Sequence, residues 1–491
     1  MGNKKLLEEN AKLKAENLWL RKQLFGSKSE RKPIKEIVEV LDLFKKELEA
    51  TLDVGNDEKE IAKVRKKRSK EEGRQPLPEN LERYEELVEL PENECSCEEC
   101  GTKLKVMGEE ITEELEFVPA TMRVRQIKRL KYACPKDSLH KIVRARMPER
   151  IIPKGIAGPS LLAQILISKY VDHLPLDRQT KIFSRMDIHI SRKTMSDWMG
   201  KSFEVLKPLI ECLRSKVLES KRLNCDETTF KVQRKLTAKK GLKKTYLWSY
   251  IGDEKWVLFD WQEGRSQSGP LEILEGFKGE TIQSDGYNVY DVVAKKLNLK
   301  QLGCWAHVRR KFVEAYEAGF QQAKPIVELI EKLYIIEKFA IEKELDPSEI
   351  HDLRDAESRP VLNEIKAGID EMIQSGTPTL KLGKAIKYAN NQWEKLTGYC
   401  DDGALLIDNN IVERSIRPAT LGWKNYLFAG SDNGAKWIAG FYSLVETCKL
   451  NGVEPGKYLT EVLRLIVDYD KEDLESLLPD AFALKYSSFK E

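Results

Sequence analysis

The chain has 491 residues, of which 41% are hydrophobic and 33% are charged, and its formal net charge is +3. This length predicts several domains. No apolar run approaches the roughly 20 residues that a membrane-spanning helix needs, and the N-terminus has no signal-peptide core. Nine cysteines in a chain this long do not indicate a disulfide scaffold. We therefore expect a soluble protein of a reducing cytoplasm, with no membrane partner.

The chain begins with a pattern typical of a short coiled coil. Leu6, Leu13 and Leu20 recur every seven residues, and asparagines fill most of the other seam positions. This combination favours a fixed register over stability. Three heptads are marginal alone, so the alternatives are self-association into at least a dimer and a helix packed within the chain. We predict a coiled-coil or helical N-terminus at 1–50 and a charged linker at 51–84.

A small cysteine-bearing module is predicted at 85–150. It contains two cysteines separated by two residues and followed by a glycine, which is half of a zinc knuckle, and such a site needs a second pair of ligands. A module this small has little hydrophobic core, so a zinc ion would stabilise it. The candidate zinc ligands are Cys97, Cys100, Cys134 and His140.

The fourth zinc ligand is open. A cysteine at 137 would repeat the spacing of the first pair, but the residue there is Asp137. His140 suits zinc better in chemical type, although its spacing is looser. Cys95 is a further candidate. The alternative is a module that binds no zinc and is held by its small core alone.

Residues 151–220 predict a helical region with three helices, of which the third is long and has Ser191 as its N-cap. The helices between 176 and 205 form a candidate helix-turn-helix for DNA binding. In that arrangement Arg192 and Lys193 would lie at the start of the recognition helix. The alternative is ordinary helical packing.

From residue 221 the pattern changes from helices to strands. Three closely spaced β-rich runs predict an antiparallel meander, and a helix, a strand, a helix and a last strand through LKQLGCWAH follow within 221–312. Hairpin-linked strands followed by alternating helices and strands are typical of an α/β ribonuclease-H-like core. Residues 313–400 predict an all-α insertion, 401–450 would complete the core, and 451–491 would form a helical tail. The expected fold is therefore multidomain.

Three acidic residues lie in distinct local settings. Asp226 follows apolar residues in an alternating strand and is expected to face the centre of a sheet, and Asp285 closes a strand just before a glycine. Glu413 lies on a helix that follows the capping candidates at 408–410. Two Mg²⁺ ions held by such carboxylates activate an attacking oxygen and stabilise a leaving one. The alternative is a strand acid, a turn acid and a surface acid with no common role.

Clusters of basic residues predict contacts with a polyanion. Residues 121–154 contain eleven Lys and Arg, and 231–244 contain seven with no acid. Arg forks match phosphate oxygens, and a neutral His307 at the predicted strand end would orient water or a phosphate. The alternatives are solvated basic faces, a structural histidine and a surface ion pair between Glu413 and Arg417. The candidates for DNA contact are His307, Arg309, Arg310, Lys311, Arg414, Arg417, Arg192, Lys193, Lys239, Lys240, Lys243 and Lys244.

Taken together, the motifs of this chain resemble those of the insertion sequence 66 family of bacterial DDE transposases. The resemblance covers nearly the whole length. It is carried by LRKQLFGSKSE, the cysteine module, YVDHLPLDRQTKIF, DETTFKV, SDGYNVYD, GCWAHVRRKF and IDNNIVERSIRPATLGWKNYLFAGSDNGAKW. No single motif is specific, but the set is.

The resemblance implies a ribonuclease-H-like catalytic core with a helical insertion before the last catalytic acid. It also implies DNA cleavage and strand transfer with two Mg²⁺ ions per active site. The implied partners are the element ends, target DNA, further copies of the chain and accessory proteins, in a bacterial cytoplasm and associated with the nucleoid. The family's fourth zinc cysteine is absent here. The family's catalytic acids match Asp226, Asp285 and Glu413, and its zinc cysteines match Cys97, Cys100 and Cys134.

Two other functions are consistent with the sequence. One is a ribonuclease-H-like nuclease or resolvase that cuts DNA without joining it, which a strand-transfer assay would distinguish. The other is a non-enzymatic DNA-binding regulator derived from a transposase. Loss of a catalytic acid would favour the regulator, but all three acids are present.

Overall fold

The computed structural model of the chain describes residues 121–132, 143–236, 239–376, 380–469 and 471–487. The described residues up to Met147 belong to one compact unit, and those from Pro148 onward belong to another. The predicted coiled coil, the charged linker and the four candidate zinc ligands lie outside the described residues. Among the helices that the structure describes, none combines the length and the apolar content needed to cross a bilayer.

The described part of the smaller unit is a short antiparallel pair of strands. β1 (Lys131–Tyr132) pairs with β2 (Val143–Arg144), so that Lys131 lies opposite Arg144. Arg129 Nε donates to the carbonyl oxygen of Ala145 at 2.8 Å. Every residue from 121 to 132 is exposed, so the basic residues of this segment face solvent.

The larger unit begins with the three helices that the sequence predicts: α3 (Pro159–Tyr170), α4 (Leu176–Ser184) and α5 (Arg192–Glu219). The Ser191 hydroxyl accepts a hydrogen bond from Thr194 N at 3.0 Å, which confirms the predicted N-cap.

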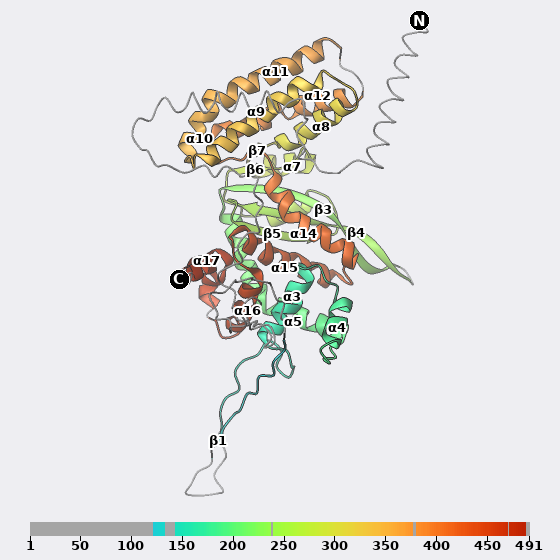
Figure 1. Ribbon diagram of the computed structural model, residues 1–491, viewed down its shortest axis with the longest axis vertical. Helices are drawn as coiled ribbons and strands as arrows, with labels where there is room; N and C mark the ends of the chain where they lie inside the picture. The colour runs from blue at the N-terminus through green and yellow to red at the C-terminus, as the bar shows by residue number, and fades with distance from the viewer. Residues whose placement is uncertain (1–120, 133–142, 237–238, 377–379, 470, 488–491) are drawn as a thin grey trace, which may run out of the picture. The chain divides into compact units, whose positions relative to one another are not determined.

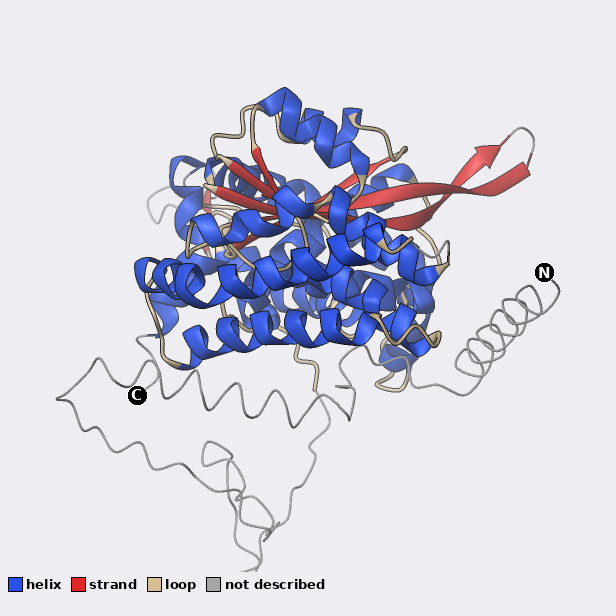
Figure 2. Cartoon of the chain, turned by 90° about the horizontal axis from the view of Figure 1, so that it is seen from above, coloured by secondary structure: helices blue, strands red, loops and turns tan. Residues whose placement is uncertain are grey.

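A five-stranded sheet forms the centre of the larger unit, with the order β5-β4-β3-β6-β7. β3, β4 and β5 are antiparallel, which confirms the predicted meander, whereas β6 and β7 run parallel to β3. The β3–β4 pairing continues to Leu236 opposite Lys239, and this ribbon extends beyond the helices around it (Figure 2). The strands and the helices between them are β3 (Arg222–Leu236), β4 (Lys239–Gly252), β5 (Trp256–Gln262), α6 (Ser268–Ile273), β6 (Thr281–Gln283), α7 (Asn288–Leu297) and β7 (Lys300–Leu302).

The last predicted strand is wrong in extent. β7 has only three residues, and Trp305 already begins α8 (Trp305–Glu317). The apolar run through Cys304 and Trp305 suggests a continuing strand, but the buried residues Trp305, Val308 and Phe312 recur at helical spacing. The basic residues that follow Cys304 therefore lie on a helix and not at a strand end.

The two faces of the sheet pack against different helices because successive strand residues point to opposite sides. On one face, Phe230, Leu247 and Phe259 contribute to a core with α3, α5, α14 (Asn410–Tyr426) and α15 (Asp432–Leu450). On the other face, Cys225 and Trp248 pack with α6 and α7. Asp226 has the same strand parity as Phe230, so its side chain belongs to the face that α14 covers.

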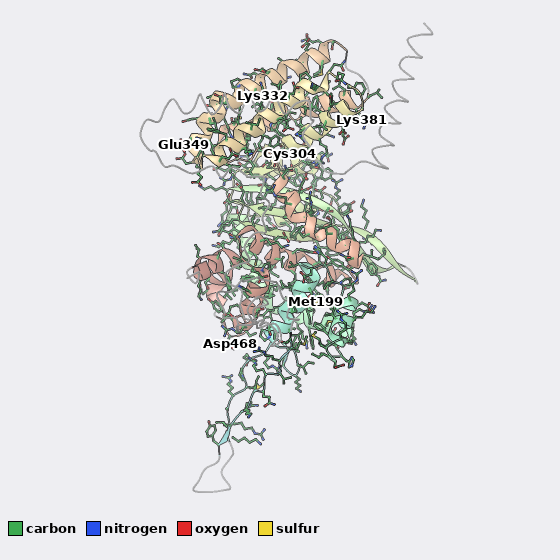
Figure 3. The ribbon with its side chains drawn as sticks, in the orientation of Figure 1. Met199, Cys304, Lys332, Glu349, Lys381 and Asp468 are labelled. Atoms are coloured by element: carbon green, nitrogen blue, oxygen red, sulfur yellow. The ribbon has the colours of Figure 1, made fainter. Side chains whose placement is uncertain are left out.

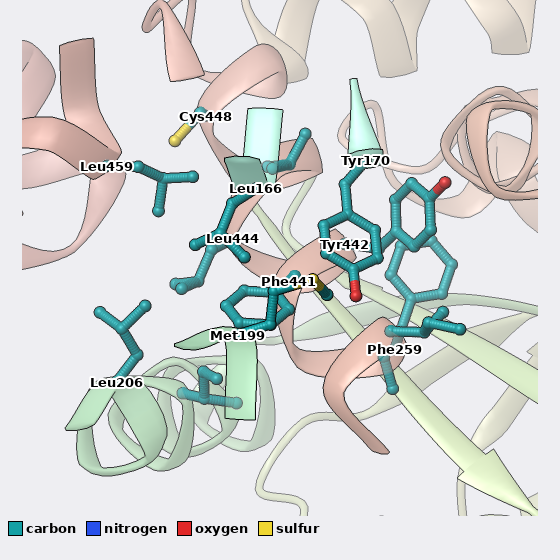
Figure 4. Close-up of a cluster of buried hydrophobic side chains, with 14 of the residues drawn as sticks. Leu166, Tyr170, Met199, Leu206, Phe259, Phe441, Tyr442, Leu444, Cys448 and Leu459 are labelled. Carbon is teal, nitrogen blue, oxygen red and sulfur yellow. The ribbon is translucent and has the colours of Figure 1, made fainter. Parts of the chain in front are cut away.

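The C-terminal helices complete the first core. Phe441 and Tyr442 of α15 contact Tyr170 of α3, with ring centroids 5.2 and 5.4 Å apart, and lie near Met199 and Phe259 (Figure 4). The chain continues through α16 (Pro455–Leu465), the 3₁₀ segment η6 (Lys471–Leu477) and α17 (Pro479–Ser487).

A second, separate core forms between β7 and α14, where the sequence predicts an all-α insertion. The described residues of 313–400 contain helices and no strand, and the helices gather on one side of the sheet (Figure 1). The buried Arg354 donates to the carbonyl oxygens of Tyr399, Asp402 and Leu405 at 2.8–2.9 Å, which joins these helices to the segment that leads into α14. The elements are α9 (Ala323–Glu342), α10 (Pro347–Leu353), the π-helix η4 (Arg354–Ser358), α11 (Arg359–Gln374), α12 (Lys381–Asn391), α13 (Trp393–Thr397) and η5 (Gly398–Asp401).

Candidate active site

The register of β3 and β6 brings two of the candidate acids together. Asn224 of β3 lies opposite Gln283, the last residue of β6. The pairing ends there, and Asp226 and Asp285 each follow two residues later, near enough for Asp285 to be the strongest of the neighbouring charges that raise the pKa of Asp226. Both are partly buried. Asp285 Oδ1 accepts a hydrogen bond from Tyr287 N at 3.0 Å, which fixes the carboxylate at the turn after β6.

The third acid reaches the same face of the sheet from α14. Glu413 lies in the first turn of this helix, which packs over β3 and β4. Burial, and then the negative charges of Asp285, Glu227 and Glu413, raise the pKa of Asp226 to about 8. The three acids therefore form one electrostatically coupled group, although they lie far apart in the sequence.

Two residues of α8 contact Glu413. His307 Nε2 is 3.5 Å from Glu413 Oε1, and Arg310 Nη2 is 3.7 Å from Glu413 Oε2. Burial and the neighbouring Arg310 charge lower the pKa of His307, which favours the neutral imidazole. The structure thus joins two of the predicted phosphate contacts to the candidate acids.

The basic residues on either side of Arg310 in α8 face the helical insertion. The Arg309 guanidinium pairs with Glu331 of α9, and Lys311 Nζ lies 4.6 Å from the ring centre of Tyr388 in α12. Both contacts follow from the helical geometry of α8, because residues 309 and 311 cannot share the face that bears Arg310. The sequence motif alone does not separate these roles.

Arg414 and Arg417 are exposed on α14. Burial raises the pKa of Glu254, and the charges of Arg222 and Arg414 oppose that rise, so Arg414 lies near the β4–β5 turn. The ion-pair partners of Glu413 among the described residues are His307 and Arg310, not Arg417. Both arginines therefore present their charges to solvent outside the acid group.

The remaining predicted DNA contacts lie on other elements. Arg192 and Lys193 are exposed in the first turn of α5, which is anchored by the buried Met195 and Trp198. On the β3–β4 ribbon, Lys243 Nζ is 3.0 Å from Glu263, while Lys244 is exposed. The backbones of Lys239 and Lys240 pair with the opposite strand.

A second carboxylate beside Asp226 escaped the sequence analysis. Glu227 points to the opposite face of the sheet, where its side chain is only 2% exposed. Its oxygens accept hydrogen bonds from Arg265 Nε at 2.7 Å and from Tyr290 OH at 2.9 Å. The Arg265 guanidinium in turn stacks 3.8 Å above the ring of Tyr287. Strand alternation separates Glu227 from Asp226, but no sequence signal identifies its distant partners.

The donor chemistry at Asp226, Asp285 and Glu413 fits a divalent cation. Carboxylate oxygens are the ligands that Mg²⁺ prefers, and the mutual repulsion that raises the pKa of Asp226 would be relieved by a positive ion. The positions of the side chains fit a metal ion less well than their chemistry does. Within the described ranges, no group of three or more His, Cys, Asp or Glu side chains is arranged to hold a metal ion, and Glu413 is directed to His307 and Arg310.

Comparison with known families identifies the chain as a transposase. A model of the "Transposase IS66 family" matches residues 154–437, which is more than half of the chain. Further models match at 12–85 (transposase C of IS166 homeodomain), 94–136 (zinc-finger binding domain of transposase IS66) and 443–479 (IS66 C-terminal element). The chain therefore belongs to the IS66 transposase family, as its motifs predict, and DNA is its partner.

Two proteins of Sinorhizobium fredii are similar over most of their length. The uncharacterized protein y4qI is 34% identical over 419 residues, which cover 82% of this chain and 76% of the relative. The uncharacterized protein y4jD is 32% identical over 491 residues, which cover 95% of this chain and 94% of the relative.

The family matches also bear on zinc. The zinc-finger match at 94–136 includes Cys97, Cys100 and Cys134 but ends before His140. A zinc-finger domain in this region indicates Zn²⁺ as a cofactor. The identity of the four ligands stays a prediction.

Proposed function

We propose that this transposase cleaves the ends of its element and joins them to target DNA, with Asp226, Asp285 and Glu413 as its catalytic acids. The observation that supports the proposal is the pairing of Asn224 with Gln283, two residues before Asp226 and Asp285, on strands over which α14 with Glu413 packs. The sheet order β5-β4-β3-β6-β7, with three antiparallel and two parallel strands, supports a ribonuclease-H-like core.

The proposed chemistry has two displacement steps. In the first, water attacks a phosphorus at the element end, the bond to the 3′ oxygen breaks, and a free 3′-OH and a 5′-phosphate result. In the second, this 3′ oxygen attacks a phosphorus of the target, and the target's own 3′ oxygen leaves. The transferred strand is thereby joined to the target without an external energy source.

Each residue of the site has a defined task in this proposal. Asp226 and Asp285 would hold divalent cations, with Glu413 completing the shell of one. Two Mg²⁺ ions so bound supply activation of the attacking oxygen and stabilisation of the leaving one. His307, whose Nε2 faces Glu413 Oε1 at 3.5 Å, would orient that carboxylate. Arg310 places a positive charge beside Glu413, where a phosphate of the bound strand would lie.

The exposed basic residues would bind the flanking DNA. The segment 121–132, the β3–β4 ribbon and the arginines of α14 all present Lys or Arg to solvent. They are rich in phosphate-binding residues and poor in Asn and Gln, which read adenine. We therefore assign them to backbone contacts. Self-association through the N-terminal coiled coil and accessory proteins of the element belong to the same proposal.

The test is a cleavage and strand-transfer assay with DNA that carries the element ends. Asp226→Asn, Asp285→Asn and Glu413→Gln should each lower cleavage at least about 100-fold and leave DNA affinity intact. The matched control is Asp468→Asn, which changes an exposed acid on the surface. Cleaved ends without joined products would make the protein a nuclease. DNA binding without cleavage by the unaltered chain would make it a regulator.

A further inference from the structure

Three buried amide side chains lie close to the three acids. Asn224, Gln283 and Asn409 are 5%, 3% and 1% exposed. Each precedes an acid by a short interval in the sequence. Asn224 lies two residues before Asp226, Gln283 lies two residues before Asp285, and Asn409 lies four residues before Glu413. Asn224 and Asp226 share a face of β3 because side chains two residues apart on a strand point to the same side, Gln283 is the last residue of β6, and Asn409 directly precedes α14.

The amides are hydrogen-bonded to one another. Asn224 Nδ2 donates to Gln283 Oε1 at 2.9 Å and to Asn409 Oδ1 at 3.0 Å. An amide nitrogen carries two protons, so both donors of Asn224 are used. This one side chain therefore links β3 to β6 and to the start of α14.

The three amides, which together form a hydrogen-bond network, also donate to backbone carbonyl oxygens. Gln283 Nε2 donates to the carbonyl oxygens of Gly303 and Leu406 at 2.9 and 2.8 Å, and Asn409 Nδ2 donates to that of Cys225 at 2.9 Å. Asn409 N also donates to Cys304 Sγ at 3.3 Å. Figure 3 labels Cys304 where the helical insertion meets the sheet. The network thus fixes the start of α14 directly beside Asp226.

Apolar packing alone would not fix these elements so closely. A slip of one residue between β3 and β6 would turn Asp285 to the opposite face from Asp226. A rotation of α14 would carry Glu413 away from both. Either change would leave buried amide groups without partners, which costs roughly 1–3 kcal/mol for each group. The network therefore penalises every arrangement in which the acids separate.

We propose that Asn224, Gln283 and Asn409 are positioning residues that hold the elements carrying the three acids beside one another, so that the acids can converge on divalent cations. They act through the acids and do not touch the substrate. This inference rests on the proposed function, because it gives the amides a role only if the acids bind catalytic ions.

The experiment compares Asn409→Ala with Asn410→Ala in the full-length protein. Asn410 is a matched control because it is the next asparagine and its side chain donates only to Asp408, at 2.6 Å. Thermal unfolding first defines a temperature at which both variants are folded. Mn²⁺ binding is then measured by electron paramagnetic resonance, and kcat and KM for end cleavage are measured separately. If Asn409→Ala does not fold, Gln283→Met replaces it, since this change removes an amide and preserves the volume.

The expected result is a 10- to 100-fold loss of Mn²⁺ affinity in the network variant, the range that loss of an outer-shell partner produces at metal sites. The kcat should fall while KM for DNA stays unchanged, and Asn410→Ala should behave as the unaltered protein. Wild-type Mn²⁺ affinity and kcat in the folded network variant would overturn the inference alone. Absence of Mn²⁺ binding by the unaltered protein would overturn the proposed function together with it.

Discussion

The two faces of the sheet at Asp226 and Glu227 treat adjacent carboxylates in opposite ways. On one face, Asp226 lies with Asp285 and Glu413, and their like charges contribute to raising its pKa. On the other face, Arg265 and Tyr290 neutralise and orient Glu227. Glu227 therefore has partners within the fold, whereas the charged neighbours that shift the pKa of Asp226 are all acids. Only an acid in the setting of Asp226 is suited to bind an external cation.

The largest effect expected from this comparison is on catalysis. Asp226→Asn should lower end cleavage at least about 100-fold, because it removes a proposed ion ligand. Glu227→Gln should change the cleavage rate less than about 10-fold, because Glu227 acts through Arg265 on the far face. Single-turnover cleavage assays at saturating Mg²⁺ measure both. Equal losses in the two variants would erase the distinction between the faces.

The two substitutions should affect the free energy of unfolding in the reverse order, with the larger loss for Glu227→Gln. Glu227→Gln should lower the free energy of unfolding by about 1–3 kcal/mol, because it weakens charge-assisted bonds to a buried carboxylate. Asp226→Asn should not lower it. Urea denaturation of both variants, compared with Asp468→Asn, tests this. A greater loss of stability in Asp226→Asn would show that Asp226 has an internal partner.

The pH dependence of stability gives a further test of Asp226. Burial raises the pKa of both carboxyl groups, that of Asp226 to about 8. A carboxyl group whose pKa rises from 3.8 to about 8 on folding is disfavoured in its charged form, so it destabilises the fold increasingly as the pH rises from about 4 to about 8. Asp226→Asn removes this penalty. With divalent ions chelated, its unfolding temperature should exceed that of the unaltered protein at pH 8 and match it at pH 4. A constant difference would contradict the assignment.

The smallest expected effect concerns two adjacent lysines of β4. Lys243 is paired with Glu263 at 3.0 Å, whereas Lys244 is exposed. A lysine that contacts DNA phosphate contributes about 0.9 to the slope of log affinity against log salt concentration. Lys244→Ala should reduce the slope by roughly that amount for all DNA sequences, and Lys243→Ala should reduce it less. Fluorescence anisotropy over a salt series measures both slopes, and unchanged slopes would make this ribbon a solubilising surface.

Local signals predicted the elements well. The strand alternation around Leu223 and Cys225 gave the central strand, and Ser191 marked the start of α5 as its N-cap. These features depend on neighbours in the sequence. The apolar run at Cys304 led to a wrong strand prediction, because three apolar residues fit a strand or a buried helix equally well.

Hydrogen bonds between residues far apart in the sequence could not be predicted from the sequence. Asn409 is one of the three capping candidates at 408–410, but its side chain makes no cap bond and instead reaches Asn224 and Cys225. The neighbouring Asp408 accepts the hydrogen bond from Asn410 N at 2.9 Å. Partners separated by about 185 residues leave no periodic pattern. The resemblance to the family supplied the three acids, and the register of β3 and β6 supplies a physical reason for their association.

In the proposed function, one face of the sheet, at Asp226, Asp285 and Glu413, binds the catalytic ions. Replacing Mg²⁺ with Fe²⁺ tests this directly, because hydroxyl radicals formed at bound iron with hydrogen peroxide cut the backbone nearby. Cuts are expected near residues 226, 285 and 413, and both excess Mg²⁺ and Asp226→Asn should abolish them. Cuts confined to other segments, or cuts that persist in Asp226→Asn, would contradict it.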